Sequence, residues 1–92
     1  MDTFTFTGII TKEELGFTAL CPEIDVASQG TTMDEAKTML LEAATLHIEG
    51  AIEDGLPYLR PIPAEADPRR IDPAHVALVF RFNVVVAVNA YA

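Results

Sequence analysis

Hydrophobic and polar residues alternate with a period of two near both ends of the chain and follow a helical period in its middle. Near the start, Thr3–Thr11 reads TFTFTGIIT, in which Phe4, Phe6 and Ile10 alternate with threonines. This alternation predicts a strand with one buried face. Near the end, His75–Val88 alternates in the same way and becomes apolar at both parities, which predicts a long strand with little polar surface.

Two shorter strands are expected between the first strand and the helix. Lys12–Gly16 (KEELG) is polar, ends in glycine and suits a hairpin loop. Phe17–Cys21 is then the second strand and Ile24–Gln29 the third, because Pro22 interrupts the ladder between them. Gly30 turns the chain toward the helix.

The middle of the chain predicts one long helix over Met33–Asp54. Thr32 suits the N-cap, and Glu35 three residues later completes a capping box. Gly55 suits the left-handed position after the helix, and Pro57 prevents its continuation. On a helical wheel the glutamates form one narrow stripe opposite a broad, mainly apolar arc that should face the sheet. The arc consists of Ala36, Leu40, Ala43, Ala44, His47, Ile48, Ala51 and Ile52.

The predicted order of elements is strand, strand, strand, helix, strand, in one domain over residues 1–92. Short turns join three antiparallel strands, and the helix crosses over so that the last strand lies parallel to another. Residues 57–74 hold five of the six prolines and form a stiff connection, with a short turn at Ala64–Asp67. The sequence predicts the α+β class, with a four-stranded mixed sheet and one long helix packed on one face.

One helix covers only one face of a sheet, so the second face and the edge of the long apolar strand need another cover. In a protein of 92 residues that cover is expected to be a second copy, giving a homodimer or tetramer. The expected interface comprises Val79, Arg81, Asn83, Val85 and Ala87.

Acidic residues outnumber basic ones by fourteen to six, and six of the acids lie within residues 32–54. Such a surface repels phosphate backbones and attracts a basic protein partner. An acidic surface that only keeps a small protein soluble is the alternative interpretation. The candidate partner-binding residues are Glu23 and Asp25 at the sheet end and Glu35, Glu42, Glu49 and Glu53 on the helix stripe.

No run of residues reaches the roughly 18 apolar positions of a membrane span, so no membrane contact is expected. The start, MDTFTFTG, lacks the basic and apolar regions of a signal peptide. A single cysteine forms no internal disulfide, which favours a reducing compartment. The expected location is the cytoplasm.

Catalytic sites are weakly supported by the sequence. A metal-dependent nuclease would require convergent carboxylates from strand interiors, and the first strand contains no acid. The acids that such a site would use are Glu23, Asp25, Asp34 and Glu35. A Cys21 nucleophile would need His47 or His75 as its base, but a lone cysteine is more often a small buried hydrophobe. Neither metal-ligand spacing nor a phosphate-binding glycine loop is present, so no enzyme activity, metal or cofactor is expected.

The run GFTALCPEIDVASQGTTMDEA, within Gly16–Gly55, resembles the HicB-type antitoxin domain. The shared features are a glycine and an aromatic residue opening the second strand, then A-x-C-P-E, then Q-G-x-T followed by E-A at the helix start. The resemblance implies a truncated RNase H-like fold, without catalytic acids, in which the first and last strands are parallel neighbours. It also implies an oligomer that pairs with HicA, a small basic mRNA-cleaving toxin, and masks its active site.

Many HicB proteins carry a further C-terminal segment that binds DNA, whereas here only Asn89–Ala92 follows the last predicted strand. Direct DNA binding is therefore not expected. Some short HicB-like proteins stand alone, so the alternative function is an oligomeric module that binds a small ligand or another protein without a toxin.

Overall fold

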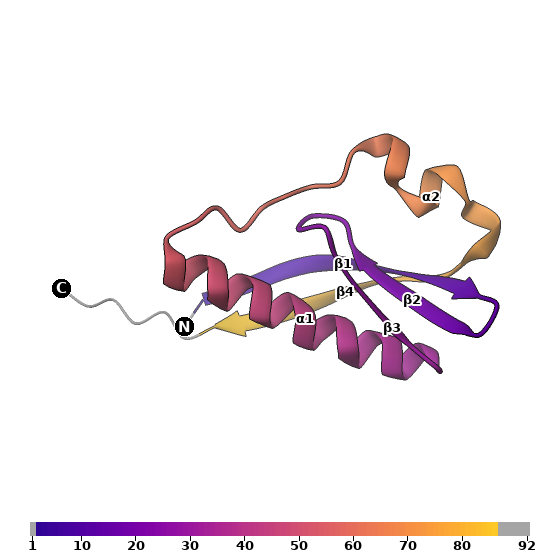
Figure 1. Ribbon diagram of the computed structural model, residues 1–92, viewed down its shortest axis with the longest axis horizontal. Helices are drawn as coiled ribbons and strands as arrows, with labels where there is room; N and C mark the ends of the chain where they lie inside the picture. The colour runs from indigo at the N-terminus through magenta and orange to yellow at the C-terminus, as the bar shows by residue number, and fades with distance from the viewer. Residues whose placement is uncertain (1, 87–92) are drawn as a thin grey trace.

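The computed structural model describes residues 2–86, which form a four-stranded antiparallel sheet with one long helix on one face (Figure 1). The strands are β1 (Asp2–Glu13), β2 (Gly16–Cys21), β3 (Val26–Gly30) and β4 (Val76–Val86), and the long helix is α1 (Met33–Asp54). Between α1 and β4 lie three short helical turns, η1 (Ala64–Ala66), α2 (Pro68–Ile71) and η2 (Pro73–His75). The α+β class with four strands and one long helix is thus confirmed.

The orientation of the last strand differs from the prediction. The strands lie in the order β3-β2-β1-β4, and β4 pairs with β1 in the antiparallel direction. The sheet is therefore antiparallel throughout, and the expected mixed sheet with parallel first and last strands is wrong.

The path of the connection between α1 and β4 explains this orientation. Helix α1 ends near the start of β1, where a direct crossover would begin a parallel strand (Figure 1). The connection instead returns along the molecule, held where the Arg60 N–H donates to the Glu23 carbonyl oxygen (3.1 Å) and the Ile62 N–H to that of Pro22 (2.9 Å). The short turns then deliver the chain to the far end of β1, where Val76 pairs with Thr11.

The ends of α1 are capped as the sequence predicts. The Thr32 hydroxyl accepts from the Glu35 N–H at 3.0 Å, as predicted. The Glu35 carboxylate accepts from the Thr31 N–H at 3.1 Å, one residue before the cap, so the reciprocal bond of the predicted capping box is shifted by one residue. At the other end Gly55 has φ 68°, and the Leu56 N–H donates to the Ala51 carbonyl oxygen at 2.8 Å. This geometry is that of a Schellman motif. Both helix boundaries therefore follow from the local sequence.

The hydrophobic core lies between α1 and the facing side of the sheet. The predicted arc of the helix is confirmed at its centre, because Ala36, Leu40, Ala44, Ile48 and Ala51 are buried. The sheet and the turn after β2 contribute Phe6, Ile10, Ala19, Cys21, Ile24, Val84 and Val86. Burying each large aliphatic side chain stabilises the fold by roughly 1.5–3 kcal/mol.

The face of the sheet opposite α1 is covered only in part. Thr7 and Ile9 on β1 are buried there, and α2 contacts β1. The alternate residues of β4 on that face are exposed, with Val79 at 47% and Val85 at 54%. The chain's own connection therefore covers part of the face that was expected to be covered by a second copy alone.

Strand boundaries shift by one or two residues, as is usual for such assignments. The third strand begins at Val26 because Ile24 and Asp25 belong to the turn, and His75 ends η2 before β4 begins. Of the predicted last strand, Ala87 and Val88 lie outside the described residues.

Gly8 on β1 pairs with Phe80 on β4, whose ring lies over the glycine. A Cβ atom at this position would be 2.2 Å from the Phe80 ring. We expect Gly8→Ala to displace that ring and to lower the free energy of unfolding by about 1–3 kcal/mol. Urea denaturation measures the change.

Gly50 is the matched control, because a Cβ there meets nothing within 4 Å. Since alanine is favoured over glycine in a helix, Gly50→Ala should stabilise the protein by about 0.8–1 kcal/mol. Equal stability of Gly8→Ala and the wild type would contradict the close contact between Gly8 and Phe80.

Candidate partner-binding surface

The face of α1 that points away from the sheet combines carboxylates with exposed hydrophobic side chains. Leu41, Glu42, Thr45, Leu46 and Glu49 line a shallow depression of about 450 Å³. Leu46 is 71% exposed, so most of its apolar side chain faces solvent. We call the surface formed by Met39 and the five residues that line this depression the outer helix face.

Helical spacing accounts for the composition of the outer helix face. Residues three, four and seven positions apart are neighbours on a helix surface, so Met39, Glu42, Leu46 and Glu49 form one continuous strip. Met39 and Leu41 are about two-fifths exposed, at 41% and 42%. The glutamates of this surface were predicted from the sequence, but these hydrophobic residues were not, although the helical wheel places them beside the glutamates.

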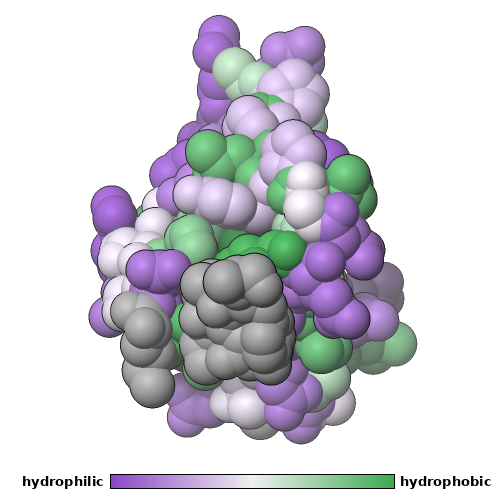
Figure 2. Space-filling view, turned by 90° about the vertical axis from the view of Figure 1, so that its left-hand side faces the viewer, coloured by the Kyte–Doolittle hydropathy of each residue, from purple (hydrophilic) through white to green (hydrophobic). Residues whose placement is uncertain are grey.

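The surface near the end of α1 also mixes the two kinds of side chain. Seen from the end at which α1 and β4 finish, hydrophobic residues stand exposed among hydrophilic ones (Figure 2). Leu56 and Leu59, just beyond α1, are 61% and 57% exposed. This end of the molecule is therefore not a uniformly acidic surface.

The other two glutamates of the predicted stripe occupy the ends of α1. Glu53 is exposed in the last turn. Glu35 is exposed in the first turn, but its carboxylate already accepts hydrogen bonds from the Thr31 N–H and hydroxyl. Of the four glutamates in the predicted stripe, Glu42 and Glu49 are therefore the two that line the depression.

Glu23 is half-buried, and its carboxylate is hydrogen-bonded within the fold. Its carboxylate accepts from the Thr7 N–H at 3.1 Å and from the Thr7 hydroxyl at 2.8 Å. The ladder between β1 and β2 begins at Ile9, paired with Leu20, so this carboxylate takes the position of the missing strand partner. The geometry indicates that Glu23 stabilises the sheet, because its carboxylate is already engaged by Thr7.

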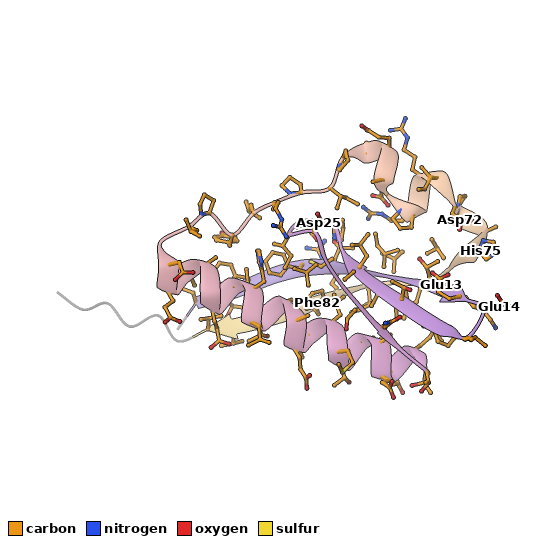
Figure 3. The ribbon with its side chains drawn as sticks, in the orientation of Figure 1. Glu13, Glu14, Asp25, Asp72, His75 and Phe82 are labelled. Atoms are coloured by element: carbon orange, nitrogen blue, oxygen red, sulfur yellow. The ribbon has the colours of Figure 1, made fainter. Side chains whose placement is uncertain are left out.

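Asp25 sits in the turn between β2 and β3, apart from the outer helix face (Figure 3). It is exposed and has φ 50°, a left-handed conformation that aspartate tolerates better than most residues. The structure therefore does not bring Glu23 and Asp25 together with the glutamates of α1 into one acidic surface.

The thiol of Cys21 is buried and poorly suited to nucleophilic chemistry. Cys21 has no exposed surface, and its Sγ atom donates to Glu23 Oε1 at 3.5 Å. Burial, followed by the nearby Glu23 carboxylate, raises the pKa of this thiol to about 12. At neutral pH it therefore remains protonated.

Both histidines have partners other than Cys21. His47 Nε2 donates to the Tyr58 carbonyl oxygen at 2.8 Å, which ties α1 to the connection. His75 Nδ1 lies 2.7 Å from Asp72 Oδ1 at the opposite end of the connection. Cys21 and both histidines therefore make hydrogen bonds within the fold, as structural residues do.

Within residues 2–86 no group of three or more histidine, cysteine or acidic side chains is arranged to hold a metal ion. Over the same residues, no helix is long and apolar enough to cross a membrane.

An acidic cluster surrounds His75 where the β1–β2 loop meets the end of the connection (Figure 3). Lys12, Glu13, Glu14, Asp72 and His75 line a shallow depression there. The hydrogen bond to Asp72, together with the charge of its carboxylate, raises the pKa of His75 above its ordinary value.

Four of the five predicted interface residues form an exposed row on β4. Val79, Arg81, Asn83 and Val85 point away from α1 and are all exposed. Asn83 Oδ1 accepts from the Thr5 hydroxyl on β1 at 2.9 Å. Ala87 lies outside the described residues.

The antiparallel sheet with one long helix is the architecture of HicB antitoxin N-terminal domains. The structure is similar to the crystal structure of the N-terminal domain of the antitoxin HicB from Burkholderia pseudomallei, with a TM-score of 0.57 and 25% sequence identity. It is also similar to a chain of the HicA3 and HicB3 toxin-antitoxin complex, with a TM-score of 0.56 and 26% identity. Each comparison covers 91% of this chain and 99% of the other chain.

These likenesses confirm the resemblance to a HicB-type domain that the sequence motifs predicted. A scan against models of protein families found no match, and a search of curated proteins found none.

Glu23→Ala should destabilise the fold, because it leaves the buried Thr7 N–H without its acceptor. We expect the free energy of unfolding to fall by about 1–3 kcal/mol in urea denaturation. Asp25→Asn is the matched control from the same turn, and it should leave stability nearly unchanged. Equal stability of Glu23→Ala and the control would contradict the structural role of Glu23.

The raised pKa of His75 predicts a pH dependence of the contact with Asp72. His75 should titrate above about 6.5 in a proton NMR titration, and Asp72→Asn should lower its pKa. Because the folded state favours the protonated imidazole, the contact stabilises the fold at low pH and weakens as pH rises through the raised pKa. An unchanged titration in Asp72→Asn would contradict this pairing.

Proposed function

We propose that this chain is an antitoxin that binds a small basic toxin of the HicA type through the outer helix face. The likeness to a chain from a toxin-antitoxin complex carries this proposal, because it covers nearly the whole of both chains. The composition of the outer helix face supports it, since exposed leucines beside glutamates suit a basic and partly apolar partner.

Charge and hydrophobic contact would have different roles at this surface. The net charge of −8 would draw a basic toxin toward the chain, and charges at the rim of an interface act mainly on the association rate. Leu46 would be buried once the toxin is in place. Its contribution would appear mainly in the dissociation rate, because burial of an apolar anchor opposes separation.

Inhibition by occupancy requires no catalysis by the antitoxin. We propose that the chain is not an enzyme and binds no cofactor, and that it acts in the cytoplasm together with its toxin. The buried thiol of Cys21 and the structural partners of both histidines support the first part.

Co-expression with the adjacent reading frame tests the proposal, since toxin and antitoxin are expected to be encoded together. The predicted result is a basic partner of HicA type that co-purifies with this chain and whose RNA cleavage is suppressed in the complex. If no such toxin binds, the alternative function as a stand-alone oligomeric module replaces the antitoxin.

Glu42→Lys combined with Glu49→Lys should slow capture of the toxin by about tenfold at low salt, because both attractive charges are reversed. Stopped-flow or surface-based association rates measure this, and the difference should shrink as salt screens the charges. The matched control is Glu14→Lys combined with Glu65→Lys, which changes net charge equally at exposed sites outside α1. Equal slowing in both double variants would contradict a specific role of the outer helix face.

Leu46→Ser tests the apolar part of the same surface. Since Leu46 is 71% exposed, the fold should tolerate the change. Dissociation of the toxin should accelerate about tenfold or more with little change in the association rate. Leu59→Ser, at a leucine exposed beyond α1, should leave dissociation unaffected.

A further inference from the structure

A second hollow lies between the last turns of α1 and the start of the connection, and its volume is about 320 Å³. We call the residues that line it the end groove. They are Leu46, His47, Gly50, Ala51 and Asp54 from α1, and Leu56, Pro57 and Arg60 from the connection. Leu46 also lines the depression on the outer helix face, so the two hollows adjoin each other.

Hydrogen bonds hold the two walls of the end groove together. His47 Nε2 donates to the Tyr58 carbonyl oxygen at 2.8 Å, and the Leu56 N–H donates to that of Ala51 at 2.8 Å. The Tyr58 ring also packs edge-on against Phe4 of β1, with the ring centroids 4.9 Å apart. The end groove is therefore formed within the single chain, and a preformed site loses less conformational entropy when it binds a partner.

Gly50, in the helical wall of the end groove, is not required by the packing of the fold. A Cβ atom at this position would meet no atom of the described residues within 4 Å. Glycine inside a helix destabilises the fold relative to alanine. One use of glycine is to let another backbone approach closely. Gly50 leaves such an approach open beside Leu46, its neighbour one turn earlier on α1.

The side chains around the end groove indicate the chemistry of an occupant. Leu46 on one wall and Leu56 on the other are 71% and 61% exposed, and burying them against an apolar side chain would be favourable. Over residues 42–60 the exposed charged side chains are four acids and one base, namely Glu42, Glu49, Glu53, Asp54 and Arg60. Charge complementarity therefore favours an occupant that has basic residues beside its apolar one.

A helix meets these requirements within a single element. Its residues three, four and seven positions apart share one face, so a large apolar side chain can enter the hollow while basic neighbours lie over the acids of α1. Two helices also pack with their axes close together where one of them has a small residue at the crossing. Binding of an amphipathic helix in an apolar groove is a recurrent mode of recognition.

We propose that a helix of the basic toxin crosses α1 over Gly50 and inserts one large apolar side chain between Leu46 and Leu56. Basic residues of the same helix then lie near Glu49 and Glu53. This inference rests on the proposed antitoxin function, and it adds the element of the toxin that makes the contact and the place where that element is anchored.

Filling the end groove tests the proposal. Gly50→Leu should remain folded, because the Cβ position is open and leucine favours a helix more than glycine does. It should weaken binding of the basic toxin that the co-expression experiment identifies by about tenfold or more, with Gly50→Ala intermediate. Surface-based binding measures the affinity, and urea denaturation checks the fold. Ala64→Leu is the control, because it adds a leucine at an exposed position outside the end groove and should bind as the wild type does.

Two leucines just beyond α1 provide a matched pair. Leu56 lines the end groove and is 61% exposed, whereas Leu59 is 57% exposed and lies outside the lining. Leu56→Ser should accelerate dissociation of the toxin about tenfold, because an apolar anchor is lost, and Leu59→Ser should not. Circular dichroism checks that both variants are folded. Equal dissociation rates in the two variants would overturn the proposed position of the anchor.

Alanine scanning of the toxin against both the wild type and Gly50→Leu identifies the occupant. Truncating the apolar residue that enters the end groove should weaken binding to the wild type and have much less effect with Gly50→Leu, because the two changes remove the same contact. This residue should lie on a helix of the toxin. A coupled residue in a strand or a loop would overturn the proposed occupant.

The outcomes separate this inference from the proposed function. A toxin that binds the wild type and Gly50→Leu equally well would overturn the helix at Gly50 and leave the antitoxin function intact. A wild-type chain that binds no such toxin would overturn both.

Discussion

Two backbone hydrogen bonds between the connection and the turn after β2 hold the connection on the path that leads to the last strand. They hold Arg60 and Ile62 against Glu23 and Pro22, so the chain returns along the molecule before its last strand begins. Strand β4 consequently enters beside the far end of β1 and runs antiparallel to it. The same path covers part of the sheet face opposite α1 and leaves the row of alternate β4 residues on that face exposed.

Glu23 stabilises the turn after β2, to which the connection is hydrogen-bonded. Glu23 fixes Thr7 at the point where β1 extends beyond the β1–β2 ladder, and its carboxylate also accepts from the buried Cys21 thiol. In an acidic protein, this carboxylate serves the fold, whereas Glu42 and Glu49 remain exposed on α1. The acidic residues therefore have two roles. Glu23 stabilises one end of the sheet, whereas Glu42 and Glu49 form an accessible surface on the helix.

Elements specified by neighbouring residues could be predicted from the sequence, and features that depend on distant residues could not. The caps of α1, its buried arc and the alternation of β1 and β4 all follow from local patterns. The direction of β4 does not, because it depends on hydrogen bonds between residues 22–23 and 60–62. Glu23 could not be distinguished from a surface acid in the sequence, because its hydrogen bonds to Thr7 also join residues that are distant in the chain. The exposure of Leu46 follows from its position on the helical wheel, opposite the buried arc of α1.

The proposed binding of a basic toxin by the outer helix face can be tested most directly by mapping amide chemical shifts. The ¹⁵N-labelled chain would be titrated with the basic toxin that the co-expression experiment identifies as its partner. The largest shifts should gather on residues 39–49 of α1, while the amides of Leu78–Val86 should change little. Shifts concentrated in the turn at residues 22–25, in the connection or along β4, with the helix unaffected, would contradict it.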